Sequence, residues 1–493
     1  MEQRNIDSSL YYTCYENGKQ ICACNVFLTA RFLSPSIIRY IVCRYETDFN
    51  RQSFPQKKHN STLYITNEDS NYTRANRAYL ADKVIISSTL KSWHVETQME
   101  PQQQEMKIII ASPSLNWLGG AQRACLHAIT VLRKTNCKIV LATIDKTDWA
   151  LVESIFGDTS KPDEEMYLFS RMPEMPILAL KQAFVALSYA LYLLAITAKN
   201  RTDLVINMGG EIVDSLGDVI YINAIPLRLM HFFSSIQPKP GSQWKIYSRL
   251  YSMFLMLLGD AADVIVANSK FTQNVIEKFL GKRALVINPP VESSRIISRV
   301  NCRRRKNAVI TISRFRSAKG LEIIPKIASY VEDCEFVVVG IVDNESERCL
   351  KELSEEIERL GVQDRVHVFK NKPYSFTLAA LSTAKVFLHT QSTEAFGMSI
   401  VESMAAGCVA IVPRTGGPWI DILDCQEGRY GFSYRSPAEA ADKIKVLLAD
   451  ESLRSEVSAR AVERALVFDS SAFGKKLLNI VEAILSNREH GAC

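Results

Sequence analysis

The sequence shows no strong excess of either charge. Its formal net charge is only +6 over 493 residues, and the basic residues are scattered apart from the run from Arg303 to Lys306. Nucleic-acid-binding domains usually gather a much stronger basic patch on one face. We therefore expect no nucleic-acid partner, whereas a weak positive charge suits an anionic membrane surface.

The cysteines follow no recognisable pattern. The twelve of them show neither a repeated metal-ligand spacing nor the pairing of a disulfide framework, and Cys22 and Cys24 are too close for the usual CxxC metal pair. Cys125, Cys334 and Cys408 lie inside or beside apolar runs. A reducing compartment fits this usage best, so the sequence favours a cytoplasmic protein.

The first 105 residues differ from the rest of the chain. The opening residues have neither the basic n-region nor the apolar h-region of a signal peptide, so we expect no secretion by that route. Their apolar runs are short, and the polar stretch TQMEPQQQE precedes Met106. We interpret residues 1–105 as an accessory or poorly ordered extension, or as an upstream start assigned in error, with the functional beginning near Met106.

From Lys107 onward, short apolar runs alternate with helix-like stretches. The runs KIIIAS, KIVLATI, DLVINM, DVIYIN, DVIVAN and ALVINP come first, and AVITIS, EFVVVG, RVHVF, VFLHT and CVAIV follow. Alternating strands and helices predict mostly parallel sheets covered by helices on both faces. The length allows two such α/β domains, which we place at residues 106–290 and 307–470, with a linker at 291–306 and a final segment at 471–493.

The stretch from Val386 to Asp421 is the most informative part of the sequence. VFLH predicts a strand, GMSIVESMAA a helix and CVAIV the next strand, with Gly407 as a typical helix stop between them. In a parallel βαβ unit, the loop and the helix start lie at the carboxyl ends of the strands, where open α/β sheets bind ligands. We therefore expect a binding site here.

Two glutamates lie eight positions apart at this edge, Glu394 in the loop and Glu402 in the second turn of the helix. Between them, Phe396 and Gly397 place backbone N–H groups at a helix start, which favours an anion such as a diphosphate. Carboxylates beside such a site are suited to accept hydrogen bonds from sugar hydroxyls, so the pair suggests a sugar nucleotide. Alternatively, Glu402 is a solvated helix residue and Glu394 an ordinary loop charge.

The segment EAFGMSIVE resembles the E-x7-E signature of the GT4 family of retaining glycosyltransferases, and MAAGCVAIVPRTGGPWIDIL continues in the same manner. The ending GGPWIDI is most similar to the subfamily of α-1,2-mannosyltransferases that extend dolichol-linked oligosaccharides from GDP-mannose. The resemblance implies the GT-B fold, in which two Rossmann-like domains face a central cleft and the last helix, here 471–493, crosses back onto the first domain. It also implies a nucleotide-sugar donor, GDP-mannose or alternatively a UDP-sugar, and no tightly bound cofactor.

A second motif, SRFRSAKG, follows the strand from Val309 to Ser313 and also resembles the family. Arg314 offers a planar fork of donors and Lys319 a mobile charge, so both can converge on phosphate oxygens. By resemblance they hold the donor diphosphate and share catalysis with Glu394; as isolated residues they would be ordinary loop cations. The sequence contains no Asp-x-Asp pair, so we expect cations and helix dipoles, and no required metal, to stabilise the leaving group.

The resemblance adds residues outside these motifs. Gly119 and Gly120 would face the donor phosphates. Alternatively, these two glycines only form a tight turn between strand and helix, which requires no ligand. Gly340 would let the base or ribose approach the sheet. Related enzymes often carry Y-x-H-x-P near the acceptor, and this chain has Asn223 at the position of the histidine. Asparagine cannot act as a base near neutral pH. His231 is therefore an alternative acceptor-side residue, although a lone histidine on an apolar helix is more often structural.

An apolar stretch lies between Pro176 and Ala198. Its uncharged part is only about 17 residues long, at the short end of what a spanning helix needs. It predicts either a buried helix or an interfacial helix with Lys181 and Lys199 at its ends. Family members that act on lipid-linked acceptors commonly sit on membranes through the first domain, so the resemblance favours peripheral contact with the cytoplasmic face of a membrane.

We therefore expect a retaining transferase that moves a hexose, mannose by resemblance, to a lipid-linked or glycan acceptor. Two alternatives stay open. A GT-B sugar-nucleotide epimerase would share the fold but would be expected to lack EAFGMSIVE. A catalytically silent nucleotide-sugar-binding scaffold is compatible with the departure at Asn223 and with the extension.

Overall fold

The computed structural model describes residues 9–16, 19–27, 106–157, 159–173, 175, 178–199, 204–229, 242–257, 262–300, 305–343 and 345–491. The chain divides into two compact units, Met1–Gln103 and Gln104–Cys493. In the first unit, β1 (Ser9–Glu16) and β2 (Lys19–Phe27) form an antiparallel pair. The rest of the expected extension lies outside the described residues.

The first domain of the second unit is built on a parallel sheet of seven strands in the order β5-β4-β3-β6-β7-β8-β9. Ile, Val and Leu fill its central strands because helices cover both faces. The edge strand β5 was not predicted, and its residues are mostly exposed or half-buried, without an apolar run. The strands are β3 (Lys107–Ala111), β4 (Lys138–Asp145), β5 (Glu164–Phe169), β6 (Leu204–Asn207), β7 (Val219–Ile222), β8 (Val264–Ala267) and β9 (Leu285–Val286).

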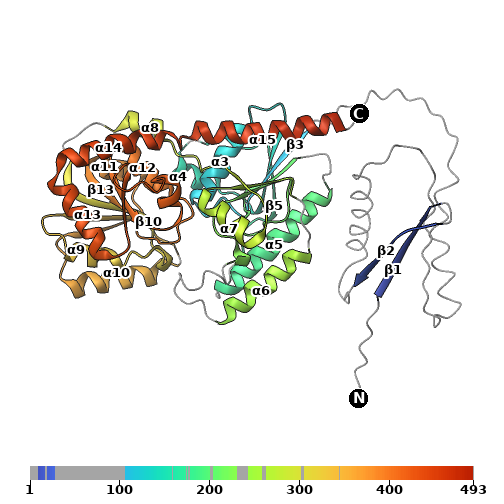
Figure 1. Ribbon diagram of the computed structural model, residues 1–493, viewed down its shortest axis with the longest axis horizontal. Helices are drawn as coiled ribbons and strands as arrows, with labels where there is room; N and C mark the ends of the chain where they lie inside the picture. Colours follow the sequence, from blue (N-terminus) through green and yellow to red (C-terminus); the bar gives the residue numbers. More distant parts are fainter. Residues whose placement is uncertain are drawn as a thin grey trace, which may run out of the picture. The chain divides into compact units, whose positions relative to one another are not determined.

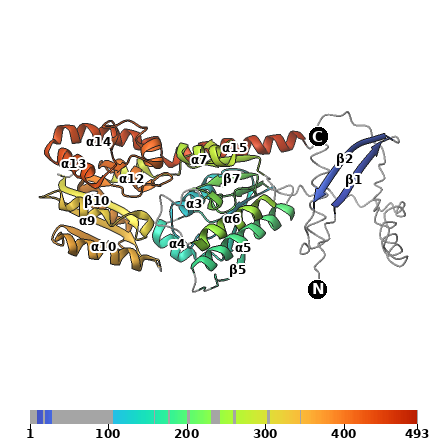
Figure 2. The same ribbon diagram turned by 60° about the horizontal axis from the view of Figure 1, so that its bottom comes forward.

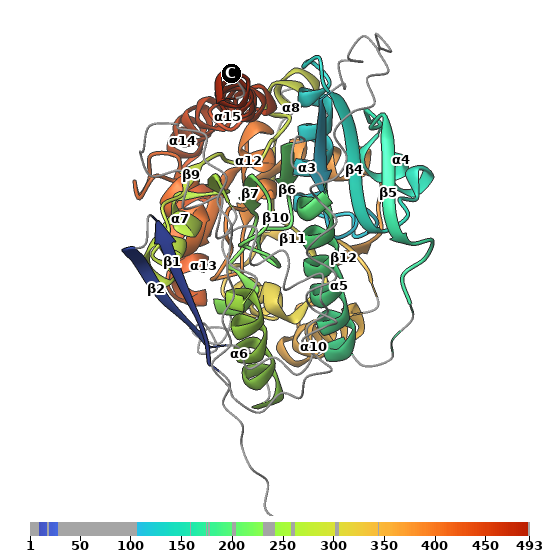
Figure 3. The ribbon, with the colours of Figure 1, turned by 90° about the vertical axis from the view of Figure 1, so that its right-hand side faces the viewer.

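Two groups of helices bury the faces of this sheet. On one face, α3 packs with the C-terminal helix α15, which runs along the first domain in Figure 1. On the other face, α5 and α6 share a core and lie side by side in Figures 1 and 3. The helices are α3 (Gly120–Leu132), α4 (Trp149–Phe156), α5 (Leu178–Lys199), η1 (Leu227–Leu229), α6 (Ser242–Leu257), α7 (Lys270–Leu280) and α15 (Ser470–Gly491).

The second domain has a parallel sheet of six strands in the order β12-β11-β10-β13-β14-β15. Figure 2 shows α9 and α10 on one side of β10, with α12 and α14 on the other. The strands are β10 (Lys306–Arg314), β11 (Glu335–Ile341), β12 (Val366–Lys370), β13 (Ala384–Leu388), β14 (Val409–Pro413) and β15 (Gly431–Tyr434). The two parallel sheets confirm the predicted α/β class.

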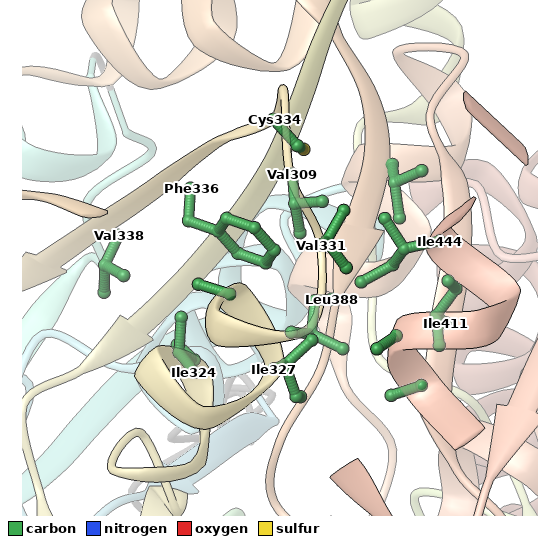
Figure 4. Packing of buried hydrophobic residues seen from close by; sticks show 14 of the residues in the cluster. Val309, Ile324, Ile327, Val331, Cys334, Phe336, Val338, Leu388, Ile411 and Ile444 are labelled. Carbon is green, nitrogen blue, oxygen red and sulfur yellow. The ribbon is translucent and has the colours of Figure 1, made fainter. Parts of the chain in front are cut away.

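The core of the second domain holds the strand ends in place. Val309, Leu388 and Ile411 from three strands pack with helix residues such as Ile327 and Ile444 (Figure 4). The helices around the sheet are η2 (Ser317–Lys319), α9 (Ile323–Ser329), α10 (Ser346–Leu360), α11 (Tyr374–Thr383), α12 (Met398–Ala405), the π-helix η3 (Pro418–Ile422), α13 (Pro437–Ala449) and α14 (Glu451–Leu466). The loops that leave these strands therefore start from fixed positions.

The segment expected as a linker, 291–306, contains α8 (Ser293–Arg299) and the first residue of β10. Val291 and Ile296 are buried in the second core. The backbone N–H of Val291 also donates to the carbonyl of Phe468, at 3.2 Å. The described part of this segment therefore packs on the second domain, because its apolar residues find partners there.

A chain that starts at Met106 is expected to melt at the same temperature as the whole protein and to keep its activity. The reason is that β3 begins at Lys107 and the compact unit that contains the candidate site begins at Gln104. Melting curves and transfer assays on both chains test this. An insoluble or inactive product would show that residues 1–105 complete the core or the site.

Candidate functional site

The start of α3 in the first domain lies against the second domain. A Cβ atom built on Gly119 would lie 1.8 Å from Nη2 of Arg314, and one built on Gly120 would lie 3.0 Å from Sδ of Met398. A side chain at position 119 would therefore displace the arginine. The structure thus brings the two predicted glycines to the two loops in which the phosphate-binding residues were predicted.

Arg314 is a cation whose guanidinium lies within ion-pair distance of no carboxylate in the described part of the chain, although Asp343, Glu345 and Glu394 act on it from further away. It ends β10 and is half-buried, and its guanidinium makes no hydrogen bond or ion pair with any residue that the structure describes. Burial, followed by the neighbouring Arg316 guanidinium, lowers the pKa of Arg314 from its ordinary value. An anion that bound here would relieve both costs, because it would neutralise a poorly solvated charge.

Lys319 and Glu394, which the sequence placed in one site, form an ion pair in the structure. Nζ of Lys319 lies 2.8 Å from Oε2 of Glu394 and 2.5 Å from Oε1 of Gln391. Burial alone would raise the pKa of Glu394, but the Lys319 cation more than offsets it, and the net shift is downward. Glu394 is therefore ionised near neutral pH, and the ordinary loop charge considered above does not describe it.

His389 lies beside this pair and was not singled out from the sequence. Burial lowers its pKa to about 4, and its Nε2 atom lies 3.9 Å from Oε2 of Glu394 without a hydrogen-bond partner among the described residues. The imidazole is therefore neutral near pH 7, which leaves Lys319 as the cation that faces Glu394. The sequence feature that could have indicated His389 is its position directly after the buried strand β13.

The loop that carries Glu394 is held by two glycines of the segment TGGPW. The backbone N–H of Gly417 donates to the carbonyl of Glu394 at 2.9 Å. A Cβ built on Gly417 would lie only 1.9 Å from the carbonyl oxygen of Ala395, and one on Gly416 would lie 2.6 Å from that of Glu394. These close approaches need glycine, so the segment after β14 fixes the position of the glutamate.

The start of α12 offers only backbone to a ligand. Gly397 precedes the helix with φ at +98°, a conformation that favours glycine. The Phe396 ring is buried against Phe468, with ring centroids 5.3 Å apart. The predicted contribution of Phe396 and Gly397 to anion binding therefore rests on their N–H groups.

Glu402 is buried and paired within the protein. It is 6% exposed, and one carboxylate oxygen accepts from the guanidinium of Arg123 on α3. A solvated position on α12 is therefore excluded. The pKa of Arg123 is raised, because the Glu402 charge outweighs the lowering effect of burial. A ribose that bound Glu402 would have to share the carboxylate with Arg123.

Arg123 also borders a cavity of about 420 Å³ between the domains. His127 lines the same cavity, and its Nε2 atom lies 3.2 Å from Glu292. Burial lowers the pKa of His127. The histidine therefore has a local partner and is separate from the predicted acceptor side.

Gly340 lies where β11 meets β10, opposite Ser313. A Cβ there would lie 2.3 Å from the carbonyl oxygen of Ser313 and 2.7 Å from the Phe315 ring. Protein atoms thus account for the need for glycine at this position. Approach of a base or ribose to Gly340 stays a prediction.

On the acceptor side, Asn223 follows β7 and its amide is held by the protein. Its Nδ2 atom donates to the carbonyl of Met208 at 2.8 Å and approaches Oε2 of Glu211 at 3.5 Å. Glu211 was missed by the sequence reasoning, although it follows a buried strand in the segment GGE. His231, the alternative candidate, lies outside the described residues.

A further contact joins the domains next to this edge. Asp421 of η3 accepts from the backbone N–H groups of Lys270 and Phe271 at the start of α7, at 2.6 and 3.2 Å. A carboxylate at a helix N-terminus satisfies unpaired N–H groups and interacts favourably with the helix dipole. The end of the GGPWID segment is therefore an inter-domain contact.

The described residues contain no group of three or more His, Cys, Asp or Glu side chains arranged to hold a metal ion. The charged groups that the structure brings to this edge are Arg314, Lys319, Glu394, Glu402 and Arg123.

Comparison with known sequences agrees with this geometry. Residues 293–464 match the family model described as glycosyl transferases group 1. The chain is 28% identical over 271 residues to a Neurospora crassa protein named GDP-Man:Man(3)GlcNAc(2)-PP-Dol alpha-1,2-mannosyltransferase, with 48% of each chain covered. The Homo sapiens protein of the same name is 29% identical over 263 residues, which cover 48% of this chain and 52% of the relative. The aligned part thus spans about half the length of these relatives.

Solved structures show the same fold at low sequence identity. HepE of Anabaena, in complex with UDP and glucose, superposes with a TM-score of 0.57 at 17% identity over 77% of this chain and 100% of its own. WaaG, a glycosyltransferase involved in lipopolysaccharide biosynthesis, gives a TM-score of 0.55 at 13% identity over 76% of this chain and 99% of its own. These similarities confirm the predicted GT-B fold, and the family match confirms the resemblance to group 1 glycosyltransferases.

Proposed function

We propose that the protein is a retaining glycosyltransferase that moves a hexose from a nucleotide sugar to a lipid-linked or glycan acceptor. The observation that carries the proposal is the juxtaposition of the half-buried Arg314 guanidinium with the start of α3 and with the Lys319–Glu394 pair. A half-buried cation beside a helix N-terminus suits a diphosphate, and the adjacent carboxylate suits sugar hydroxyls.

GDP-mannose is the donor that we favour, and a UDP-sugar is the alternative. The support for mannose is that relatives matching about half of the chain carry the name GDP-Man:Man(3)GlcNAc(2)-PP-Dol alpha-1,2-mannosyltransferase. A dolichol-linked oligosaccharide is the corresponding acceptor.

The charged residues have separate tasks in the proposed reaction. As the bond between the sugar and the diphosphate breaks, negative charge grows on the phosphate oxygens, and Arg314 and Lys319 stabilise it together with the N–H groups at the starts of α3 and α12. Glu394 orients the hexose through its hydroxyls, and Glu402 binds the ribose. By resemblance to the family, the acceptor attacks on the same face, and the leaving phosphate takes its proton.

The test is release of GDP from GDP-mannose by the purified protein, with and without a dolichol-linked oligosaccharide acceptor. A transferase releases GDP in step with the glycosylated product. An epimerase changes the sugar nucleotide without an acceptor, and a silent scaffold binds the nucleotide without turnover. Either of the latter two results would refute the proposal, and a parallel thermal-shift screen of nucleotide sugars would identify the donor.

We further propose that the first domain rests on the cytoplasmic face of a membrane through α5 and α6. Over Leu180–Ala198, α5 is long and apolar enough to be a membrane span by length and composition. However, Val185, Tyr189 and Leu193 on one face of α5 are buried in the first-domain core. If α5 spanned a bilayer, these residues would lose their contacts with the first-domain core. A peripheral position at the membrane surface therefore suits α5 better.

The opposite faces of α5 and α6 present large apolar side chains to solvent, each between 47% and 63% exposed. Such neighbouring side chains favour an apolar environment. They are Leu180, Leu187 and Leu191 on α5, and Leu250, Met253 and Met256 on α6.

Replacing Leu187 and Leu250 together with glutamate is expected to abolish flotation with vesicles that contain anionic phospholipid, and to leave the melting temperature nearly unchanged. The two leucines are exposed in solution and become buried only in the membrane, so the substitutions weaken membrane binding and not folding. Burying one leucine side chain contributes roughly 1.5–3 kcal/mol. Leu466→Glu, at a leucine of similar exposure on α14, is the matched control. Equal flotation of all three proteins would argue against this face.

A further inference from the structure

Glu211 lies at the middle of the sheet edge that meets the second domain. In the strand order of the first sheet, β6 and β7 lie between β3 and β8. The loop after β3 touches Arg314, and the helix start after β8 binds Asp421. Glu211 follows β6 and Asn223 follows β7, so this carboxyl and this amide lie between two points of inter-domain contact.

The backbone around Glu211 is fixed from several sides. The carbonyl of Glu211 accepts from the N–H of Leu227 at 2.7 Å, and the N–H of Gly210 donates to the carbonyl of Tyr221 at 3.0 Å. A Cβ on Gly210 would lie 2.7 Å from the same carbonyl oxygen. The loop therefore packs tightly on β7, so the backbone that carries the carboxyl has a fixed position.

The Glu211 carboxylate can still accept a ligand hydroxyl, because a carboxylate has about four lone-pair sites and those described as occupied are fewer. Oε2 lies 3.4 Å from the backbone nitrogen of Asn223 and 3.5 Å from its side-chain nitrogen. The backbone N–H of Glu211 itself also bonds to the carboxylate, and the residue is half-buried. Burial raises the pKa of Glu211 to about 7.

The titratable groups that face Glu211 are two buried tyrosines, Tyr189 on α5 and Tyr221 on β7. Burial raises the pKa of both phenols well above the ordinary tyrosine value. They stay neutral near pH 7, so the change of charge in this range belongs to Glu211.

We propose that Glu211 and Asn223 form a hydroxyl-binding subsite for the acceptor glycan, in which the Glu211 carboxylate is the hydrogen-bond acceptor and Asn223 positions it. The assignment rests on the proposed function. It supplies an ionisable group beside the position where Asn223 replaces the histidine of related enzymes. Its role is to bind and orient a sugar hydroxyl, not to remove its proton.

The same loop is connected to the proposed membrane face. The Tyr251 hydroxyl on α6 donates to the carbonyl of Ile212, the residue after Glu211, at 2.9 Å. The neighbouring residues Leu250 and Met253 on α6 point their apolar side chains to solvent. A glycan attached to a lipid in that membrane would thus reach the first domain close to Glu211.

The test compares wild type with Glu211→Gln, Glu211→Asp and the control Glu165→Gln between pH 6 and pH 8. Glu165 is a half-buried first-domain glutamate whose carboxylate accepts from Thr147 and Trp149, so its change is chemically matched. We expect the wild-type KM for the dolichol-linked acceptor to improve as Glu211 ionises. At pH 8, Glu211→Gln should raise this KM by about tenfold, the worth of one hydrogen bond to a charged group, and should remove its pH dependence.

The conservative variant and the control separate this role from a structural one. Glu211→Asp keeps a titrating group and should keep the pH dependence, while Glu165→Gln should follow wild type. Melting temperatures give a readout that needs no substrate. The folded protein holds the Glu211 proton up to about pH 7, so ionisation costs stability as pH rises from the ordinary glutamate range. Glu211→Gln should therefore melt above wild type at pH 8 and close to it at pH 5.

Failure of the subsite and failure of the proposed function give different results. If wild type transfers sugar and Glu211→Gln keeps the same acceptor KM and pH profile, the subsite is wrong and the function stands. If wild type transfers nothing, the function is wrong. In that case methyl α-mannoside is titrated into the GDP-saturated proteins at pH 8, and thermal stabilisation of wild type but not of Glu211→Gln would support the subsite. Equal shifts, or none, would overturn it.

Discussion

Replacing Lys319 with alanine is expected to lower kcat/KM for the nucleotide sugar by about 10²–10³-fold. A preorganised charge that stabilises a developing anion in a partly buried site is commonly worth this much in rate. Lys319 is held ready by Gln391 and Glu394, so little reorganisation is needed when the diphosphate leaves. The alanine variant also leaves the Glu394 charge without its partner, and the donor would then meet a repulsive carboxylate.

Arg314→Lys should also be harmful, although it keeps the charge. The planar fork of arginine can bind two phosphate oxygens at once, and lysine cannot reproduce that geometry. Lys326→Ala, at an exposed lysine on α9 of the same domain, serves as the control. Steady-state kinetics and melting curves of the four proteins test the prediction, and wild-type kinetics in a folded Lys319→Ala protein would remove the phosphate-binding assignment.

Glu394→Gln is expected to lower kcat by about 10²-fold, because a charge contact to the hexose is lost where positive charge develops in the transition state. Glu402→Gln should instead raise the donor KM by about tenfold with a smaller effect on kcat, because the ribose is bound equally in the ground and transition states. The two carboxylates lie at one edge of the site but have different partners, Lys319 and Arg123.

The half-buried partner of Glu402, Arg123, adds a stability effect that separates the two variants further. Glu402→Gln leaves the Arg123 guanidinium without its counter-charge, and breaking a part-buried pair from one side is destabilising because the remaining charge is incompletely solvated. Its melting temperature should therefore fall, and the double variant Arg123→Gln, Glu402→Gln should recover part of the loss. Identical kinetic signatures for Glu394→Gln and Glu402→Gln in fully folded protein would refute this division of labour.

Local patterns in the sequence predicted most of the strands and the main site motifs. Buried parallel strands such as β3 and β13 are continuous apolar runs because both faces of the sheet are covered. The positions of Lys319 and Glu394 after their strands followed from the same pattern, since loops that leave parallel strands collect at one edge. The edge strands β5 and β15 were missed: β5 has no buried residue and therefore no apolar run, and the four residues of β15, Gly-Phe-Ser-Tyr, are too few and too mixed to form one.

Contacts between distant residues could not be predicted in this way. Nothing near Glu402 in the sequence indicates that Arg123 would neutralise it, because the two are 279 positions apart and meet only when the start of α3 lies against α12. The contact between Asp421 and the start of α7 likewise joins residues that are far apart in the sequence. The apolar composition of α5 likewise predicted a buried or an interfacial helix equally well.

The sequence by itself thus determined where strands, glycine turns and charged loops occur, because these depend on periodicity and on the conformations open to each residue. Only the tertiary structure decided which face of α5 is buried, which charges are paired, and that the half-buried carboxyl of Glu211 lies between two inter-domain contacts. Burial and pairing depend on what packs against a side chain, and the free energy of a charge changes far more with those surroundings than with its neighbours in the chain.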